Sequence, residues 1–207
     1  ELSMYDITRT ITPATAVWPG DAAFHFDRVL ELAQGHSVNL TTLHLSAHTG
    51  THADAPYHYT AAGEHPAATP LDHYIGPAHV ASISRKNGGI SPSDFADHDL
   101  FGLKRLLIHT WVSQLPDDQW PEEFPYPTLE LIDWLADRGG VLLGVDMPSV
   151  DSFDSKDLPC HHRLYQRGLR NLESLNLSGV TDGRYELIAL PLKIDGVCGS
   201  PVRAILR

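Results

Sequence analysis

The segment HTGTHADAPYH, residues 48–58, gathers metal-binding side chain types among small residues. Gly50 and Pro56 disfavour a helix at this point. In an extended chain, side chains two residues apart project to the same side. Four candidate groups then share one face: His48, His52, Asp54 and His58. Because imidazoles and a carboxylate are the ligands expected for zinc or another divalent ion, the segment predicts a metal site.

A metal with open coordination positions would give this site a hydrolytic chemistry. It lowers the pKa of a bound water to about 7, which makes a hydroxide nucleophile at neutral pH. A histidine-rich surface loop, or core histidines bonded to backbone carbonyls, would explain one or two of the four residues but not all four in phase. For His44, which precedes the segment, we expect a supporting or core position rather than a ligand role.

We expect a strand just before this segment, and its polar side chains would lie on the same face as the four candidate groups. VNLTTLHLSAH, residues 38–48, alternates apolar and polar residues, with Leu43 and Leu45 on one side and His44 and His48 on the other. Further strands are expected in SMYDITRTI (3–11), on both sides of the Pro19–Gly20 turn, and in HVASI (79–83), RLLIHTWV (105–112) and VLLGVDMPSVD (141–151), with a final pair in YELIALPL (185–192) and GSPVRAILR (199–207).

Two helices are expected beside these strands. TLELIDWLADRGG, residues 128–140, predicts a helix that Thr128 caps and that ends near Gly139. SPSDFADHD, residues 91–99, predicts a short helix with Ser91 as its N-cap. Many strands and few helices, without regular βαβ alternation, indicate a mixed α/β (α+β) class in which one domain, residues 1–207, has a mixed or antiparallel sheet core.

Composition excludes several classes of partner. The 207 residues carry a formal net charge of −11, which argues against nucleic acid and anionic membrane surfaces because both require a basic face. No apolar run approaches the roughly 20 residues that cross a bilayer. The chain has two cysteines, Cys160 and Cys198, so a disulfide framework is excluded and a reducing cytoplasm is the expected location.

The segment also resembles a family signature. H-x-G-T-H-x-D-x-P-x-H is the motif of the metal-dependent cyclase family, and residues 48–58 fill every defined position. VWPGD (17–21), LPCHH (158–162), NLESLNL (171–177) and the C-terminal strands resemble the kynurenine formamidase branch of that family. The similarity therefore spans nearly the whole chain. It implies a cyclase-like swivelling β/β/α fold.

The resemblance implies a role for each matching residue. Two divalent metals, zinc by ligand type, would be bound by His48, His52 and Asp54 together with His161 and Glu173, with Asp54 and Glu173 shared. His58 would be the general acid/base, and Trp18 would pack on an aromatic ring of the substrate. His162 is the alternative at the His161 position, although the Leu-Pro-x-His register favours His161. Ligand type alone leaves manganese and cadmium open.

The pairing of His161 with Glu173 makes a structural demand. Residues 161–175 resemble one amphipathic helix, yet twelve residues of α-helix span about 18 Å, whereas two ligands of one zinc each lie about 2 Å from it. We therefore expect the helix to stop near Gly168 and NLES, residues 171–174, to be extended. If the helix continued, Glu173 would be a solvated surface residue.

The activity that the resemblance implies is hydrolysis of N-formyl-L-kynurenine to L-kynurenine and formate, an arylformamidase reaction of tryptophan degradation, in a homodimer with a loop from one subunit lining the other's site. An isatin-hydrolase-like enzyme that opens a cyclic amide with a single metal is the nearest alternative, and a metal-binding module without turnover is another. A serine nucleophile is disfavoured because the sequence has no G-x-S-x-G.

Overall fold

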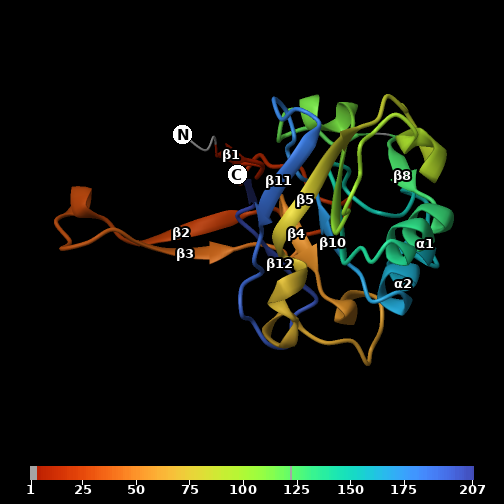
Figure 1. Cartoon of the computed structure of the whole chain (residues 1–207). Coiled ribbons are helices and arrows are strands. Elements are labelled where there is room, and N and C mark those ends of the chain that lie inside the picture. The colour runs from red at the N-terminus through yellow and green to blue at the C-terminus, as the bar shows by residue number, and fades with distance from the viewer. Residues whose placement is uncertain (1–3, 122) are drawn as a thin grey trace.

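A computed structural model describes residues 4–121 and 123–207, and its strands form three sheets (Figure 1). The strands are Tyr5–Asp6 (β1), His25–Leu30 (β2), Leu40–His44 (β3), His52–Asp54 (β4), Ile75–Ser82 (β5), Gly88–Ile90 (β6), Arg105–His109 (β7), Pro125–Pro127 (β8), Leu142–Val145 (β9), Arg170–Glu173 (β10), Gly183–Ile188 (β11), Gly199–Pro201 (β12) and Ile205–Leu206 (β13). The main sheet has nine strands in the order β1-β13-β11-β5-β7-β9-β10-β4-β12, and the pairs β2–β3 and β6–β8 are separate.

The two α-helices are short and lie on the same side of this sheet (Figure 1). The α-helices are Leu129–Asp137 (α1) and Pro159–Gln166 (α2). Single 3-10 turns lie at Leu32–Gln34 (η1), Pro56–His58 (η2), Pro66–Ala68 (η3), Leu71–His73 (η4), Pro92–Phe95 (η5) and Trp111–Gln114 (η6). Over the described ranges, no helix has the length and apolar character needed to cross a membrane. The predicted mixed α/β architecture with a sheet core is confirmed.

The centre of the sheet is parallel and buried on both faces. β5, β7, β9 and β10 run parallel to one another, in that order. Leu106 and Ile108 of β7 pack in the cluster that includes α1 and α2, while Leu107 between them packs in the cluster on the other face. Alternate side chains of one strand therefore enter two cores, which explains why β7 has a continuous apolar sequence.

Local signals set the ends of both α-helices. The Thr128 hydroxyl accepts a hydrogen bond from Leu131 N and caps α1, and Gly139 follows that helix with a left-handed φ of 75°. α2 ends at Gln166, Gly168 is left-handed with φ 71°, and the chain returns as β10. The predicted stop near Gly168, with NLE extended, is confirmed. The short helix predicted at residues 91–99 is the 3-10 turn η5, with a capping box between Ser91 and Asp94.

Two strand predictions need correction. Residues 10–18 form no strand before the Pro19–Gly20 turn, although β2 follows it. The C-terminal pair is present as β11 with β13, but GSPVRAILR splits, and β12 pairs with β4 at the other edge of the sheet. The last residues therefore span the sheet from the edge beside the histidine segment to the edge beside the N-terminus.

The strand before the histidine segment also differs from the prediction. β2 and β3 form a two-stranded hairpin that projects from the body of the molecule (Figure 1). All five residues of β3 are exposed, so neither of its faces enters the core. His44 lies on this hairpin, stacks on His25 and contacts Asp27 at 2.8 Å. Its expected supporting or core role is therefore wrong.

Candidate metal centre

The residues of the histidine segment reach the site from three different backbone conformations. His48 lies in a turn at residues 47–50, where Gly50 has a left-handed φ of 63°. His52 and Asp54 lie two apart on β4 and share one face, and His58 ends the 3-10 turn η2. The prediction of one extended face for all four residues is therefore wrong, and only His52 and Asp54 share a strand. The four side chains nevertheless converge.

Two later segments bring the remaining predicted residues to β4. Glu173 of β10 pairs in register with His52, and the two strands are antiparallel. His161 lies in the first turn of α2 and is buried, whereas His162 is partly exposed. The register that favoured His161 over its neighbour therefore agrees with the burial of the two side chains.

The side-chain atoms of this cluster are separated by distances that ligands of shared ions would have. The distance from Asp54 Oδ1 is 3.0 Å to His48 Nδ1 and 3.4 Å to His52 Nε2. On the other side, His161 Nε2 lies 3.2 Å from Asp54 Oδ2 and 3.4 Å from Glu173 Oε1. Two ligands at 2.0–2.1 Å from a tetrahedral zinc are about 3.4 Å apart. The cluster therefore matches the geometry of a metal centre with Asp54 between two histidine groups.

Unpartnered buried atoms support this fit. His52 Nε2 and Asp54 Oδ1 are both buried and have no hydrogen-bond partner among the described residues. Buried polar atoms are almost always satisfied, and an orphaned pair implies a missing ion or solvent partner. Since these two atoms lie 3.4 Å apart, the donor set fits a divalent cation.

A second set of groups holds the cluster in place. Asp151 Oδ2 lies 2.6 Å from His161 Nδ1, and Asp151 also accepts bonds from two backbone amides of α2. Asn171 donates to Asp54 at 2.7 Å and to Glu173 at 3.2 Å. Sequence reasoning did not identify either residue. The sequence could have indicated Asn171, because it lies two positions before Glu173 on a segment expected to be extended, so both side chains share a face. No sequence pattern indicated Asp151.

The site is strongly charged when no metal is bound. Burial would lower the pKa of His48, but its contacts with Asp54 and Cys198 raise it to about 10. Burial opposes protonation of His52 as well, and contacts with Asp54 and Glu173 raise its pKa to about 9. His161 has a pKa well above its ordinary value because Asp151, Asp54 and Glu173 outweigh its burial. Conversely, these histidines hold the pKa of buried Asp54 well below its usual range.

The cluster forms the floor of a pocket of about 350 Å³. His48, His52, His58, His161 and Glu173 line it, together with Trp18, Trp120 and Leu158. Trp18 stacks on Phe153 with ring centroids 5.2 Å apart and meets Trp120 edge-on. The pocket therefore combines polar ligands with an apolar aromatic wall, which is typical of a small-molecule site.

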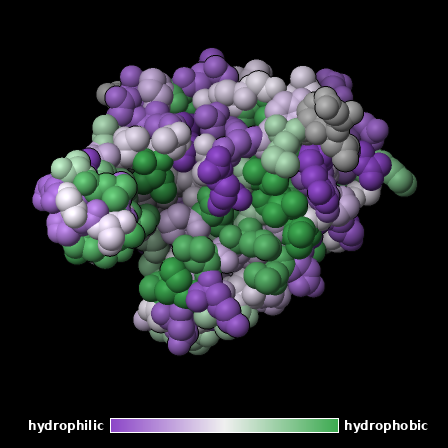
Figure 2. Space-filling model, turned by 90° about the vertical axis from the view of Figure 1, so that its left-hand side faces the viewer, coloured by the Kyte–Doolittle hydropathy of each residue, from purple (hydrophilic) through white to green (hydrophobic). Residues whose placement is uncertain are grey.

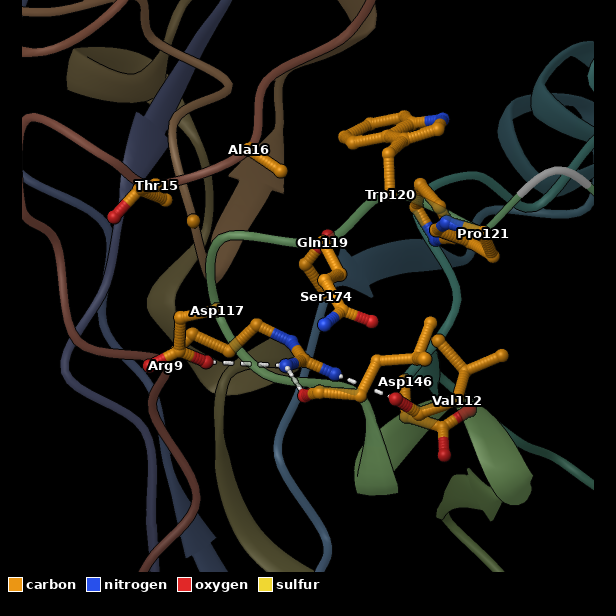
Figure 3. Close-up of a pocket in the computed structure, with 13 residues that line it drawn as sticks. Arg9, Thr15, Ala16, Val112, Asp117, Gln119, Trp120, Pro121, Asp146 and Ser174 are labelled. Atoms are coloured by element: carbon orange, nitrogen blue, oxygen red, sulfur yellow. Dashed lines mark hydrogen bonds and ion pairs between the residues drawn. The ribbon is translucent and has the colours of Figure 1, made fainter.

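Figure 3 shows a second hollow, which adjoins this pocket. It shares Trp120, Pro148 and Ser174 with the larger pocket but has a volume of only about 30 Å³. The Arg9 guanidinium spans it, bonded to Asp117 at 3.1 Å and to the carbonyl of Val112. This hollow has room for about one water molecule, so of these two spaces only the larger one would accept an organic substrate.

Known proteins share both the sequence and the fold. Residues 5–152 match the Cyclase family model. The kynurenine formamidase of Salinibacter ruber is 44% identical over 100% of this chain and 98% of its own length, and that of Maricaulis maris is 42% identical over 99% of this chain and 97% of its own.

Two solved structures superpose over nearly the full chain. Isatin hydrolase A from Labrenzia aggregata, bound to benzyl benzoate, has a TM-score of 0.84 at 25% identity, over 99% of this chain and 93% of that one. A structure described as a potential metal-dependent hydrolase with cyclase activity has a TM-score of 0.84 at 27% identity, over 99% of this chain and 96% of that one. The predicted cyclase-like fold is confirmed.

Metal binding is expected to release protons. At pH 7 the raised pKa values leave His48, His52 and His161 protonated in the metal-free protein, and each must lose its proton to bind an ion. Loading the metal-free protein with Zn²⁺ at pH 7 should therefore release about three protons per chain, and the apparent affinity should rise as the pH increases from 7 towards 9. Calorimetry in buffers of different ionisation enthalpy measures the release, and a binding enthalpy independent of the buffer would contradict it.

Proposed function

The chain belongs to the Cyclase family, and we propose that it is a kynurenine formamidase, a hydrolase that converts N-formyl-L-kynurenine to L-kynurenine and formate. The observation that carries the proposal is the convergence of three histidines and two carboxylates on the floor of an aromatic pocket. Full-length relatives at 44% and 42% identity bear this name.

The donor set divides into two groups around Asp54. His48, His52 and Asp54 would hold one divalent ion, and Asp54, His161 and Glu173 would hold a second, with zinc favoured by ligand type. Glu173 would be shared as Asp54 is, because its Oε2 also lies 3.4 Å from His52 Nε2. When bound, the ions supply a nucleophile at neutral pH and a positive charge for the oxyanion that develops on the formyl oxygen. Asn171 donates to both carboxylates and keeps each of them directed at the centre.

His58 is the residue for proton transfer. Its ring centroid lies 4.1 Å from that of His48 and 5.9 Å from that of His161, yet the residue is exposed to the pocket. An imidazole in this position takes a proton from the attacking group and returns one to the departing aniline nitrogen. The rigid 3-10 turn that begins at Pro56 sets the position of the ring.

Trp18 binds the aromatic ring of the substrate. The Pro19–Gly20 turn closes with a hydrogen bond from Asp21 N to Trp18 O at 2.9 Å and presents the indole at the pocket. Phe153 and Trp120 pack against the indole and fix its plane. The anthraniloyl ring of N-formylkynurenine is flat and largely apolar, so it suits this wall.

Two charges at the pocket favour this substrate over isatin. Asp21 and Lys156 both line the pocket, are exposed, and make no ion pair with any residue in 4–121 or 123–207. N-formylkynurenine carries an α-ammonium and an α-carboxylate, which are complementary to Asp21 and Lys156. Isatin has neither group. Isatin hydrolysis is the second candidate because isatin hydrolase A has the same fold at 25% identity.

The active form is a homodimer built on the β2–β3 hairpin. Several apolar side chains of the hairpin are about half exposed: Val29, Leu32, Val38, Leu40 and Leu43. Figure 2 views the molecule from the side on which the hairpin projects, and hydrophobic residues gather over this face. A two-stranded hairpin is marginally stable alone, so a second copy of the chain would bury these apolar side chains.

The cellular location of the protein is the cytoplasm. Both cysteines are free thiols, as in a reducing compartment.

The formamidase proposal is tested with His58→Ala. The metal-loaded variant should hydrolyse N-formyl-L-kynurenine roughly 10²–10⁴ times more slowly, because the leaving amine loses its proton donor. Its metal content should match that of the wild type. The control His98→Ala, which changes a histidine paired with Asp182 outside the pocket and the hairpin, should keep wild-type activity. A wild-type rate in His58→Ala would refute the acid/base role. Full activity after removal of metal by a chelator would refute the metal requirement.

The two pocket charges are tested by substrate comparison. Lys156→Met and Asp21→Asn should each lower kcat/KM for N-formyl-L-kynurenine about tenfold, equivalent to about 1.4 kcal/mol. Hydrolysis of 2-formamidoacetophenone, which has the aryl formamide without the amino acid group, should change less than about twofold. Lys104→Met, which changes a lysine bonded to Gly139 O beside α1, is the control. Equal losses on both substrates would contradict charge recognition, and isatin turnover without formamidase activity would favour the second candidate.

The hairpin interface is tested by light scattering on the eluting protein. The wild type should elute with twice the mass of one chain, and Leu43→Asp should shift it to the monomer, because a buried charge at the interface is unfavourable. Phe101→Asp is the matched control, since Phe101 is 82% exposed and lies away from the hairpin. A monomeric wild type, or a Leu43→Asp variant that stays dimeric, would exclude this interface.

A further inference from the structure

Each of the three candidate ligand histidines has one ring nitrogen that faces the carboxylates. The other ring nitrogen contacts a hydrogen-bonding group outside the cluster. His161 presents Nε2 to Asp54 and Glu173, and its Nδ1 is held by Asp151 at 2.6 Å. His52 presents Nε2 to the same carboxylates, and its Nδ1 lies 2.9 Å from Gly50 O. Such outer partners fix the tautomer and the plane of a metal-binding imidazole.

His48 follows the same pattern with a different kind of partner. Its Nδ1 lies 3.0 Å from Asp54 Oδ1, and its Nε2 lies 3.2 Å from the sulfur of Cys198. The two ring nitrogens point in diverging directions, so the nitrogen that faces Cys198 is not the one that faces the carboxylate. A sulfur therefore occupies the position that a carboxylate holds behind His161 and a carbonyl holds behind His52.

The backbone around Cys198 is held firmly against His48. β12 pairs with β4, with Gly199 opposite Asp54, and Ala55 N donates to Cys198 O at 3.0 Å. A Cβ on Gly199 would lie 3.1 Å from His48 Cε1 and 3.0 Å from Ala53 O. The chain thus approaches the imidazole closely, and the backbone of Cys198 is held beside His48.

We propose that Cys198 is a positioning residue for the metal centre: its sulfur accepts the Nε2–H of His48 and leaves Nδ1 free to bind an ion beside Asp54. The inference rests on the metal site of the proposed function but not on its substrate. Ligand atoms of Cys198, His48 and His58 also lie within 4.8 Å of one another, so direct binding of a metal by the sulfur is the alternative that an experiment must separate.

The test measures metal affinity and the spectrum of the cobalt-loaded protein. Cys198→Val removes the acceptor at similar volume and should weaken binding of the first Co²⁺ about 10–100-fold in chelator competition. Cys198→Ser keeps an acceptor and should restore most of that affinity. Wild-type protein loaded with Co²⁺ should lack the intense near-ultraviolet charge-transfer band that a thiolate ligand produces. Asp151→Asn, the matched control, should weaken the ion bound by His161 instead.

Several outcomes overturn the proposal. A thiolate-to-cobalt band in the wild type that is lost in Cys198→Ser would make Cys198 a direct ligand. Wild-type affinity in Cys198→Val would make the contact incidental. If circular dichroism shows that Cys198→Val is unfolded, Cys198→Ala decides the question by the same competition. Wild-type protein that binds no ion would refute this inference and the metal site together, whereas metal binding without formamidase activity would refute only the proposed substrate.

Discussion

The structure depends on one buried carboxylate. The Asp54 side chain has no exposed surface, and an isolated charge at such depth would cost several kcal/mol. Here the charge is compensated from every side: by histidines from the preceding turn, from its own strand and from α2, and by the amide of Asn171. The need to neutralise this group explains why segments far apart in sequence meet at β4. Protons on the histidines and metal ions are alternative ways to meet the same need.

Backbone strain is concentrated beside this carboxylate. Among the described residues other than glycine, two have positive φ, Leu158 at 44° and Ser174 at 55°. Leu158 precedes the helix that carries His161, and Ser174 follows Glu173 at the end of β10. Residues held in this region cost about 1–3 kcal/mol each and tend to mark functional sites. The strain therefore lies just before the helix that carries His161 and just after Glu173, and the Thr51 hydroxyl holds the second of these turns by donating to Ser174 O.

Sequence reasoning recovered the site in part, for identifiable reasons. The motif at residues 48–58 contains several metal-binding side chain types close together, so its chemistry could be predicted directly. A continuous helix would have kept His161 and Glu173 too far apart, which predicted the break that Gly168 provides. The two-residue period failed between His44 and His48, because periodicity along a strand contains no information about where the chain turns away. The contacts of Asp151 with His161 and of Cys198 with His48 were not predicted, because the fold alone brings these residues together.

The pairing of β4 with strands near the C-terminus has a consequence for synthesis of the chain. Asp54 and Glu173 are separated by 119 positions, and His48 and Cys198 by 150. At 5–20 residues per second, a ribosome takes roughly 6–24 s to progress from the aspartate to the glutamate. During this interval the histidine segment has emerged from the ribosome without the strands that cover it. The centre can therefore be assembled only after β10 and β12 have been synthesised, and a captured ion would report that translation has passed these strands.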